Sequence, residues 1–204
     1  MADEEPISVK GATILGLLKY VSEKLGPEGR AELLKSLDKK DRAVFFESTD
    51  SSEPKTISLA EWYPYRTYIN FLKAVIRKVG KGDINLCKDI GYWSADRDLN
   101  PEKGLYSFYA SDAFKGDLSL IYRTSIPVIW GQMYNKGKIE IEEVEKGRKA
   151  TFKVRDFPEV TEESCLIIGA WTERGSRLVS GSEVKVGVKY KPAPGIDCEF
   201  QLEW

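Results

Sequence analysis

The sequence contains no histidine, and this absence excludes several kinds of catalytic and metal site. Histidine is the side chain that most often acts as a general base near neutral pH, and it is a frequent metal ligand. Serine–histidine–aspartate and cysteine–histidine catalytic sites therefore cannot form in this chain. Zinc sites with histidine ligands and haem held by a proximal histidine are excluded for the same reason. Carboxylates, lysines and tyrosines remain available, so catalysis by those groups stays open.

Long apolar runs and an excess of charge are also missing. No apolar run approaches the roughly 18 residues that a membrane-spanning helix needs, and no apolar signal segment follows the acidic start Met1–Glu5. The net charge is -1, from 31 basic and 32 acidic residues, which does not favour nucleic acid or anionic membrane as partners. Cys87, Cys165 and Cys198 form no close pair along the sequence, which favours a reducing compartment. We therefore expect a cytoplasmic protein without a membrane span.

The N-terminal half has the apolar spacing of helices. The expected helices cover residues 14–25, 30–37, 41–46, 65–79, 83–93 and 118–134. Gly26-Pro27 is expected to end the first of them, and residues 47–54 read as a loop. Pro127 is expected to kink the last helix because it removes one backbone hydrogen bond.

The apolar period changes to two after residue 138, which is typical of half-buried antiparallel strands. One expected hairpin joins strands around 139–142 and 151–155 through a turn at 145–148, and a helix follows over 161–181. The second hairpin joins strands over 184–190 and 198–204 through Pro192–Gly195. The sequence therefore predicts a single α+β domain over residues 1–204. Its helical N-terminal half precedes a hairpin-helix-hairpin unit, whose four strands form an antiparallel sheet covered by helices.

Several short strings occur in one order along nearly the whole chain. They are Gly11–Leu15, Trp62–Pro64, Gly82-Asp83, Ile129-Trp130, Tyr134–Gly137, Asp156–Pro158, and Gly195–Phe200 with Trp204. In these strings and in their order, the chain resembles a myxobacterial-type paralogous family of unknown function. That family is similar to the 4-vinyl-reductase-type domain and to the ligand-binding fold of nitric-oxide sensors and Golgi-transport tethering components. The resemblance implies a homodimeric, non-enzymatic module that senses or scaffolds, in some members with a hydrophobic pocket between helices and sheet.

Two departures limit what the resemblance implies for cofactors. Haem-binding relatives use a histidine as iron ligand, and this chain has none. Hydrocarbon-sensing relatives carry a second cysteine eight positions before the one that matches Cys198, where this chain has Tyr190. A lone thiolate cannot complete a tetrahedral zinc site. We therefore expect no cofactor and no bound metal.

Aromatic residues in and before the proline-containing helix are candidates for a ligand pocket. Rings with polar edges beside a helix kink are suited to line an apolar pocket with a few orienting groups. The alternative is that the same rings fill the core. The candidates for binding a hydrophobic small molecule are Trp93, Phe108, Tyr109, Tyr122, Trp130 and Tyr134.

The segment 62–68 carries more aromatic surface than one apolar helix stripe needs. Trp62, Tyr63 and Phe71 fall outside that stripe, and Arg66 lies beside them. Aromatic residues next to arginine are typical of interface hot spots, which predicts a homodimer joined through the helical half. The alternative is that the 47–54 loop or the first helix covers these residues within one chain.

The remaining candidates have ordinary interpretations that we favour. Cys198 is either a leftover ligand or redox thiol, or else a small core residue. Cys165 is either a thiol whose pKa the helix dipole lowers or a buried structural residue. The core interpretation is preferred for both. Asp89, Asp96 and Asp98 are either paired carboxylates for acid–base or cation chemistry or one solvated helix face, and the solvated face is preferred.

The leading hypothesis is a dimeric binding module that senses or scaffolds and passes its signal to a separate protein partner. The first alternative is a small isomerase or lyase that uses carboxylates and tyrosines, which a carboxylate with a strongly shifted pKa inside a cleft would favour. The second alternative is a purely structural partner-binding protein, which a fully packed interior would favour.

Overall fold

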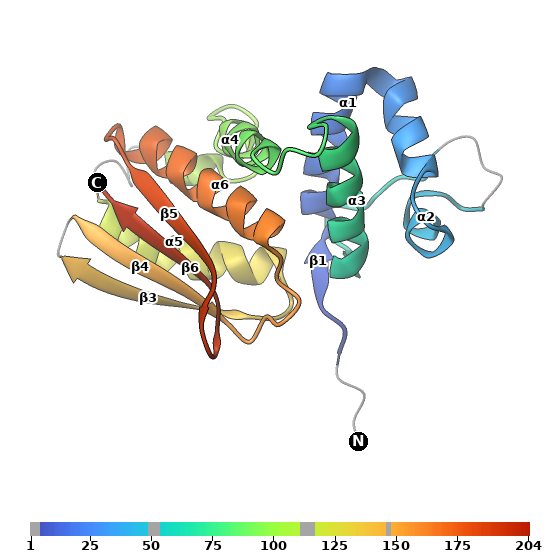
Figure 1. Cartoon of the computed structure of the whole chain (residues 1–204). Coiled ribbons are helices and arrows are strands. Elements are labelled where there is room, and N and C mark those ends of the chain that lie inside the picture. Colours follow the sequence, from blue (N-terminus) through green and yellow to red (C-terminus); the bar gives the residue numbers. More distant parts are fainter. Residues whose placement is uncertain (1–4, 49–53, 111–116, 146–147) are drawn as a thin grey trace. The chain divides into compact units, whose positions relative to one another are not determined.

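Helices make up the first part of the chain, and a four-stranded sheet dominates the last part (Figure 1). The computed structural model describes residues 5–48, 54–110, 117–145 and 148–204. By its contacts the chain divides into two units. Unit 1 spans Met1–Leu86 and Met133–Asn135, and unit 2 spans Cys87–Gln132 and Lys136–Trp204. Whether both units fold together as one domain over residues 1–204 stays a prediction.

Unit 1 is mainly helical. Its described elements are β1 (Ser8–Lys10), α1 (Gly11–Lys35), α2 (Lys39–Phe45), β2 (Trp62–Pro64) and α3 (Tyr65–Lys78). Gly26 interrupts α1 with φ 72° and ψ 176°. Glycine adopts a positive φ at little cost, and proline suits the first turn of the helix that follows. The predicted end of the first helix at Gly26-Pro27 is confirmed, and the helix expected over 30–37 forms the second half of α1.

A small antiparallel sheet in unit 1 was not predicted from the sequence. β1 pairs with β2, so that Val9 lies opposite Tyr63. Tyr134 forms a further bridge to Val9, and the Ser8 amide donates to Asn135 Oδ1 at 2.7 Å. Three-residue strands are too short to display an apolar period of two, which is the signal by which strands are found.

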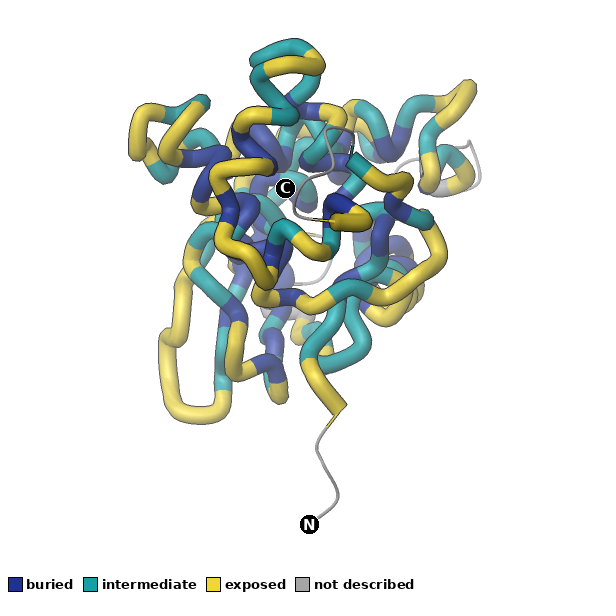
Figure 2. Tube along the Cα trace, turned by 90° about the vertical axis from the view of Figure 1, so that its right-hand side faces the viewer, coloured by how far each residue is buried: buried dark blue, intermediate teal, exposed yellow. Residues whose placement is uncertain are grey.

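The core of unit 1 is built around α3. Phe71 and Leu72 are fully buried, and the ring of Phe71 meets the edge of Phe45 with centroids 5.3 Å apart. Asp41 of α2 is buried as well, and it accepts hydrogen bonds from Thr67 Oγ1 at 2.6 Å and from Asn70 Nδ2 at 2.7 Å. A buried carboxylate is costly unless it is hydrogen-bonded, so these bonds fix which faces of α2 and α3 meet. Figure 2 shows burial along the chain.

Unit 2 contains the large sheet. Its described elements are α4 (Leu86–Asp98), the short 3-10 helix η1 (Ser107–Ala110), α5 (Leu118–Met133), β3 (Lys138–Glu145), β4 (Lys149–Arg155), α6 (Glu162–Ser180), β5 (Lys185–Ala193) and β6 (Ile196–Glu203). The strands are antiparallel in the order β3-β4-β6-β5, with α5 and α6 over one face (Figure 1). The predicted α+β class with its hairpin-helix-hairpin unit is confirmed. Residues 146 and 147 of the first expected turn lie outside the described residues.

The register of the sheet places apolar side chains on the helix-covered face. Phe152 lies opposite Phe200, and Val154 lies opposite Cys198. These four residues and Leu202 are all buried, as the period-two pattern predicts. No helix in the described parts of the chain has the length and apolar character needed to cross a bilayer.

The outer face of the sheet carries alternating charges. Glu140 lies opposite Lys153, Lys153 opposite Glu199, and Glu199 opposite Lys189, which makes one row across all four strands. Opposite charges on facing strands stabilise a sheet modestly, whereas like charges would destabilise it. The exposed Glu140 and Glu142 therefore lie on the solvent side of β3, as the sequence predicts.

Helix α6 packs closely against its neighbours in unit 2 through small residues. A Cβ atom on Gly91 of α4 would lie 2.5 Å from the Ile167 carbonyl oxygen and 2.6 Å from the Ala170 Cβ. On the sheet side, a Cβ atom on Gly169 would overlap the Val188 side chain. The separation of α6 from α4 and from the sheet is thus set by positions that have no side chain.

Replacing Gly91 with alanine is expected to lower the free energy of unfolding. The added methyl group would overlap the backbone of α6, and overpacking costs about 1–3 kcal/mol. Alanine gains only about 1 kcal/mol over glycine in a helix, so the net effect is a loss. Chemical denaturation followed by circular dichroism measures the change.

Gly131→Ala in α5 is the matched control. A Cβ atom at Gly131 has no described atom within 4 Å, so only the helix propensity changes there. This variant should be as stable as the parent or more stable by up to about 1 kcal/mol. Equal effects of the two substitutions would contradict the close approach of α4 and α6 at Gly91.

Candidate functional site

Tyr122 is the predicted pocket residue that borders a cavity in unit 2. The cavity lies between α5 and α6, has a volume of about 30 Å³, and is lined mostly by apolar side chains that include Ile126 and Trp171. The Tyr122 hydroxyl donates to Ser176 Oγ at 2.8 Å, and Ser176 donates to the Thr172 carbonyl at 2.6 Å. Burial raises the pKa of the Tyr122 phenol above its usual value. A cavity of this size has room for about one water molecule, and an organic ligand does not fit.

The structure does not gather the other predicted pocket residues around Tyr122. Trp93 of α4 lies under the guanidinium of Arg97, and Phe108 of η1 is 66% exposed. Trp130 of α5 is buried and donates from its indole nitrogen to the Lys136 carbonyl at 3.1 Å.

Two further members of that set lie elsewhere. Tyr134 belongs to unit 1, where its ring contacts Tyr65 with centroids 6.2 Å apart. The side chain of Tyr109 lies outside the described residues. The aromatic ligand pocket therefore stays a prediction, and the described rings have packing partners of their own.

The predicted interface residues differ in their exposure. Trp62 is 42% exposed and carries the Lys10 ammonium 4.0 Å from its ring centroid. The Tyr63 hydroxyl accepts from the Ser58 amide at 3.0 Å, and burial raises the pKa of this phenol. Arg66 is exposed. These three residues remain candidates for an interface.

The expectation that Phe71 is exposed was wrong. Phe71 is 0% exposed and packs against Phe45 within unit 1. The helix that carries it buries Tyr65, Thr67, Tyr68, Ile69, Phe71, Leu72, Ala74, Val75 and Ile76. Because these positions cover most of the circumference of α3, the helix has more than the one apolar stripe assumed from the sequence.

The structure brings two thiols together in the core of unit 2. Cys165 of α6 and Cys198 of β6 are fully buried, which confirms the core interpretation of both. A hydrogen bond with Cys198, together with burial, raises the pKa of the Cys165 thiol. Burial, aided by the charge of Glu163, also raises the pKa of Cys87 to about 12. Thiolates are the reactive and metal-binding form, so Cys87 and Cys165 are poor nucleophiles and poor metal ligands.

The three aspartates of α4 do not share one solvated face. Asp89 and Asp96 are exposed, and Asp96 pairs with Arg174 at 2.8 Å. Asp98 is 4% exposed, so the solvated interpretation was wrong for this residue. It accepts from the Trp171 indole at 3.1 Å and pairs with Arg97, which gives the carboxylate a structural role. Among the described residues, no group of three or more acidic or cysteine side chains is arranged to hold a metal ion.

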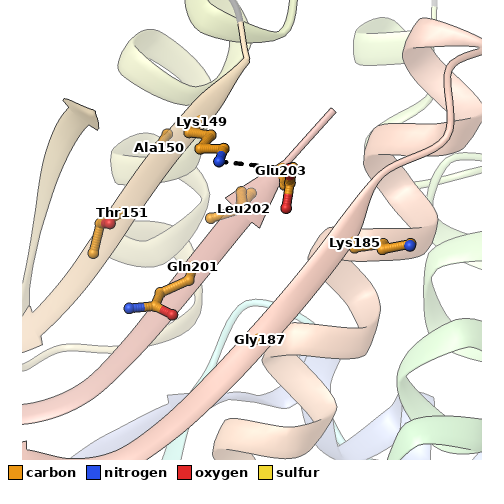
Figure 3. Close-up of a pocket in the computed structure, with 8 residues that line it drawn as sticks. All are labelled: Lys149, Ala150, Thr151, Lys185, Gly187, Gln201, Leu202 and Glu203. Carbon is orange, nitrogen blue, oxygen red and sulfur yellow. Dashed lines mark ion pairs between the residues drawn. The ribbon is translucent and has the colours of Figure 1, made fainter. Parts of the chain in front are cut away.

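A shallow hollow of about 420 Å³ lies on the outer face of the sheet. Gly187 leaves space there beside Gln201, and Lys149 pairs with Glu203 at 3.6 Å (Figure 3). Figure 3 also shows Lys185 pointing away from that pair. Ion pairs between exposed side chains contribute little to stability. The lining of this hollow mixes polar and apolar residues in similar shares, so it is less apolar than a typical ligand pocket.

Unit 1 contains a larger, mostly apolar groove that sequence reasoning missed. The groove has a volume of about 460 Å³, and we call it the α1 groove. Its lining residues are Leu15, Leu18, Lys19, Ser22, Arg30, Pro54, Lys55, Thr56 and Ile57. Pockets for small molecules measure about 300–1,000 Å³ and are mostly apolar with a few polar groups, so the α1 groove fits that description.

Two polar residues that line the α1 groove, Ser22 and Arg30, lie on either side of the interruption of α1. Because Gly26 breaks the helix, Arg30 returns towards the first half of α1 and donates from Nη1 to Ser22 Oγ at 3.1 Å. The Nε atom of Arg30 is buried and has no hydrogen-bond partner among the described residues. The sequence signal that could have located this part of the groove was Gly26-Pro27 followed closely by an arginine.

Comparison with known proteins supports a fold and no family. No protein-family model matches the chain, and no curated protein matches its sequence. A similar solved structure is an H-NOX protein from S. oneidensis in the Fe(II)NO ligation state, with TM-score 0.64 and 14% identity, covering 95% of this chain and 98% of that chain. Another is the Fe(II) unliganded H-NOX protein from K. algicida, with TM-score 0.60 and 13% identity, covering 95% of both chains.

A third similar structure is an H-NOX from Shewanella woodyi in the Fe(II)CO ligation state, with TM-score 0.59 and 13% identity, covering 95% of this chain and 93% of that chain. The resemblance to the fold of nitric-oxide sensors is thereby confirmed, while no match supports the myxobacterial-type family. At these identities the likeness establishes the fold alone. The chain has the H-NOX fold.

Proposed function

We propose that this chain is a non-enzymatic binding module of the H-NOX fold that holds an apolar small molecule in the α1 groove. The observation that carries the proposal is the groove itself, a mostly apolar depression of about 460 Å³ with a few hydrogen-bonding groups in its lining. The interior of unit 2 offers no comparable space beside Tyr122, where the cavity measures about 30 Å³.

Haem held by a histidine or a cysteine thiolate does not fit the residues of this chain. The similar solved structures are H-NOX proteins in Fe(II) states. Protein ligands to haem iron are histidine, cysteine thiolate, methionine or tyrosine. The chain has no histidine, its three cysteines are buried, and raised pKa values hold the Cys87 and Cys165 thiols in their protonated form. We therefore derive no function through haem.

The alternative of a small enzyme receives less support. Asp96 and Asp98 each form an ion pair with an arginine, and Asp98 also accepts a hydrogen bond from an indole. Glu142 is exposed, and a hydrogen bond from Lys153 with its charge lowers the pKa of this carboxyl. A general acid or base needs a pKa close to the working pH. A carboxyl group with a lowered pKa on an open sheet face therefore does not favour catalysis.

In the proposed role the module is a homodimer that passes its signal to a separate protein. Support for the dimer now rests on Trp62 and Arg66, because Phe71 is buried. Leu59, close to β2 in the sequence, is 59% exposed, and Trp62 is 42% exposed, so apolar side chains are accessible near the start of α3. Aromatic residues and arginine are enriched where partners meet.

Purified protein is expected to bind neither haem nor stoichiometric zinc. Titration with hemin should give no sharp Soret band, and elemental analysis should find less than about one tenth of a zinc per chain. A histidine-containing H-NOX domain treated in the same way is the positive control. A stable one-to-one haem complex would contradict the donor chemistry described above.

The α1 groove is expected to bind a medium-chain aliphatic molecule. Leu18→Asp should weaken the binding of 1-decanol at least about tenfold, because it places a charge on the apolar wall. Leu120→Asp is the control, since Leu120 is an exposed leucine of α5 that does not line the groove. Calorimetry measures both. If the parent protein binds neither 1-decanol nor decanoate, the proposed function is wrong, and the packed interior of unit 2 would favour a structural protein.

Sedimentation at micromolar concentration is expected to show a dimer. Trp62→Glu should shift the protein to monomer with an unchanged helical spectrum, because it puts a charge into the proposed interface. Leu178→Glu, at an exposed leucine of α6, should leave the dimer intact. A monomeric parent protein would end the dimer proposal.

A further inference from the structure

We infer that the α1 groove takes a free aliphatic carboxylate, whose anionic head is held by Arg30 where Gly26 interrupts α1. The inference rests on the proposed function, and it adds the chemical class of the ligand and the residue that recognises it. Its basis is the unsatisfied Arg30 nitrogen, the charge of the groove lining and the apolar wall beside it.

The position of Arg30 is fixed by bonds within α1. Gly26 has φ 72° and ψ 176°, and the helix resumes at Pro27. Arg30 then donates from Nη1 to Ser22 Oγ at 3.1 Å, while Ser22 uses its own hydroxyl hydrogen to bond the Leu18 carbonyl at 2.8 Å. Ser22 therefore acts as an acceptor for Arg30, and the guanidinium is tethered at one of its nitrogens.

The Nε donor of Arg30 remains without a partner among the described residues although the atom is buried. A guanidinium presents its N–H groups in a planar fork that matches the two oxygens of a carboxylate. Buried donors are almost always hydrogen-bonded, and a charged donor is the most costly kind to leave unpaired. Because Arg30 lines the groove, an anionic oxygen that enters it meets the guanidinium and adds an acceptor to a group that lacks one at Nε.

The charge of the lining selects the same ligand. Lys19, Arg30 and Lys55 line the α1 groove, and its lining includes no aspartate or glutamate among the described residues. Lys55 is held in place by a bond from Nζ to the Ala43 carbonyl at 3.1 Å. Three cations around an apolar depression attract an anion and disfavour a cationic ligand.

The rest of the groove is suited to a hydrocarbon chain. Leu15, Leu18 and Ile57 contribute aliphatic side chains, and Pro54 adds an apolar ring. Burial of methylene groups against such walls is favourable in proportion to the apolar area removed from water. An aliphatic carboxylate matches both the cations and the apolar walls of the lining, whereas inorganic phosphate matches only the cations.

The test compares decanoate, 1-decanol and inorganic phosphate by calorimetry. The parent protein is expected to bind decanoate at least about tenfold more tightly than 1-decanol, as a charge-assisted hydrogen bond predicts. Phosphate should bind more weakly than either. Arg30→Gln should lower the decanoate-to-decanol affinity ratio most of the way to one, because Lys19 and Lys55 remain in the lining. The affinity for 1-decanol should stay unchanged, which also shows that the variant is folded.

Arg42→Gln is the matched control. Arg42 also lies in unit 1 and also has a buried Nε without a described partner, but it does not line the α1 groove. This variant should keep the full preference for decanoate. Lys19→Gln, at an exposed groove position, is the second variant and should reduce the preference by a smaller factor than Arg30→Gln.

The outcomes separate the two proposals. Equal affinity of the parent protein for decanoate and 1-decanol would overturn the role of Arg30 and leave the binding module standing. Retention of the full decanoate preference in Arg30→Gln would do the same. Absence of binding by both decanoate and 1-decanol would overturn the binding module and, with it, the carboxylate ligand.

Discussion

The arrangement of unit 2 depends on how closely α6 approaches its neighbours. Gly169 meets Val188 of the sheet, and Gly91 of α4 meets the backbone and Ala170 of α6. Small residues at both contacts bring these layers close together. The cavity that Tyr122 borders between α5 and α6 has a volume of only about 30 Å³. The α1 groove of unit 1, at about 460 Å³, offers far more space for a ligand than this cavity does.

Much of the fold could be predicted because its elements are long enough to show their period. The strands of the large sheet alternate cleanly, so residues such as Phe200 and Leu202 reveal their buried phase. The β1–β2 pair was missed because three residues show no period. The burial of Phe71 and Asp98 was missed because it depends on partners distant in sequence, Phe45 and Trp171.

The candidate site was harder to predict than the fold. Aromatic residues were predicted to line a pocket because their rings are apolar and their edges are polar. In the structure the polar groups of Trp130 and Tyr122 are instead hydrogen-bonded to a backbone carbonyl and to a serine. The α1 groove uses aliphatic side chains and cations, which are common on any helix surface. Its location depends on the break at Gly26, which brings Arg30 to Ser22. The sequence indicates that the helix is interrupted at Gly26, but it does not indicate that Arg30 then forms a hydrogen bond with Ser22.

The return of residues 133–135 to unit 1 has a consequence for dissecting the molecule. The Ser8 amide donates to Asn135 Oδ1, and Asn135 Nδ2 donates to the Pro6 carbonyl at 2.9 Å. A gene fragment ending at Leu86 would encode every helix of unit 1 yet lack the side chain that completes its N-terminal strand. The two units are distinct by their contacts but interleaved in the gene, so neither can be excised as one continuous stretch of sequence.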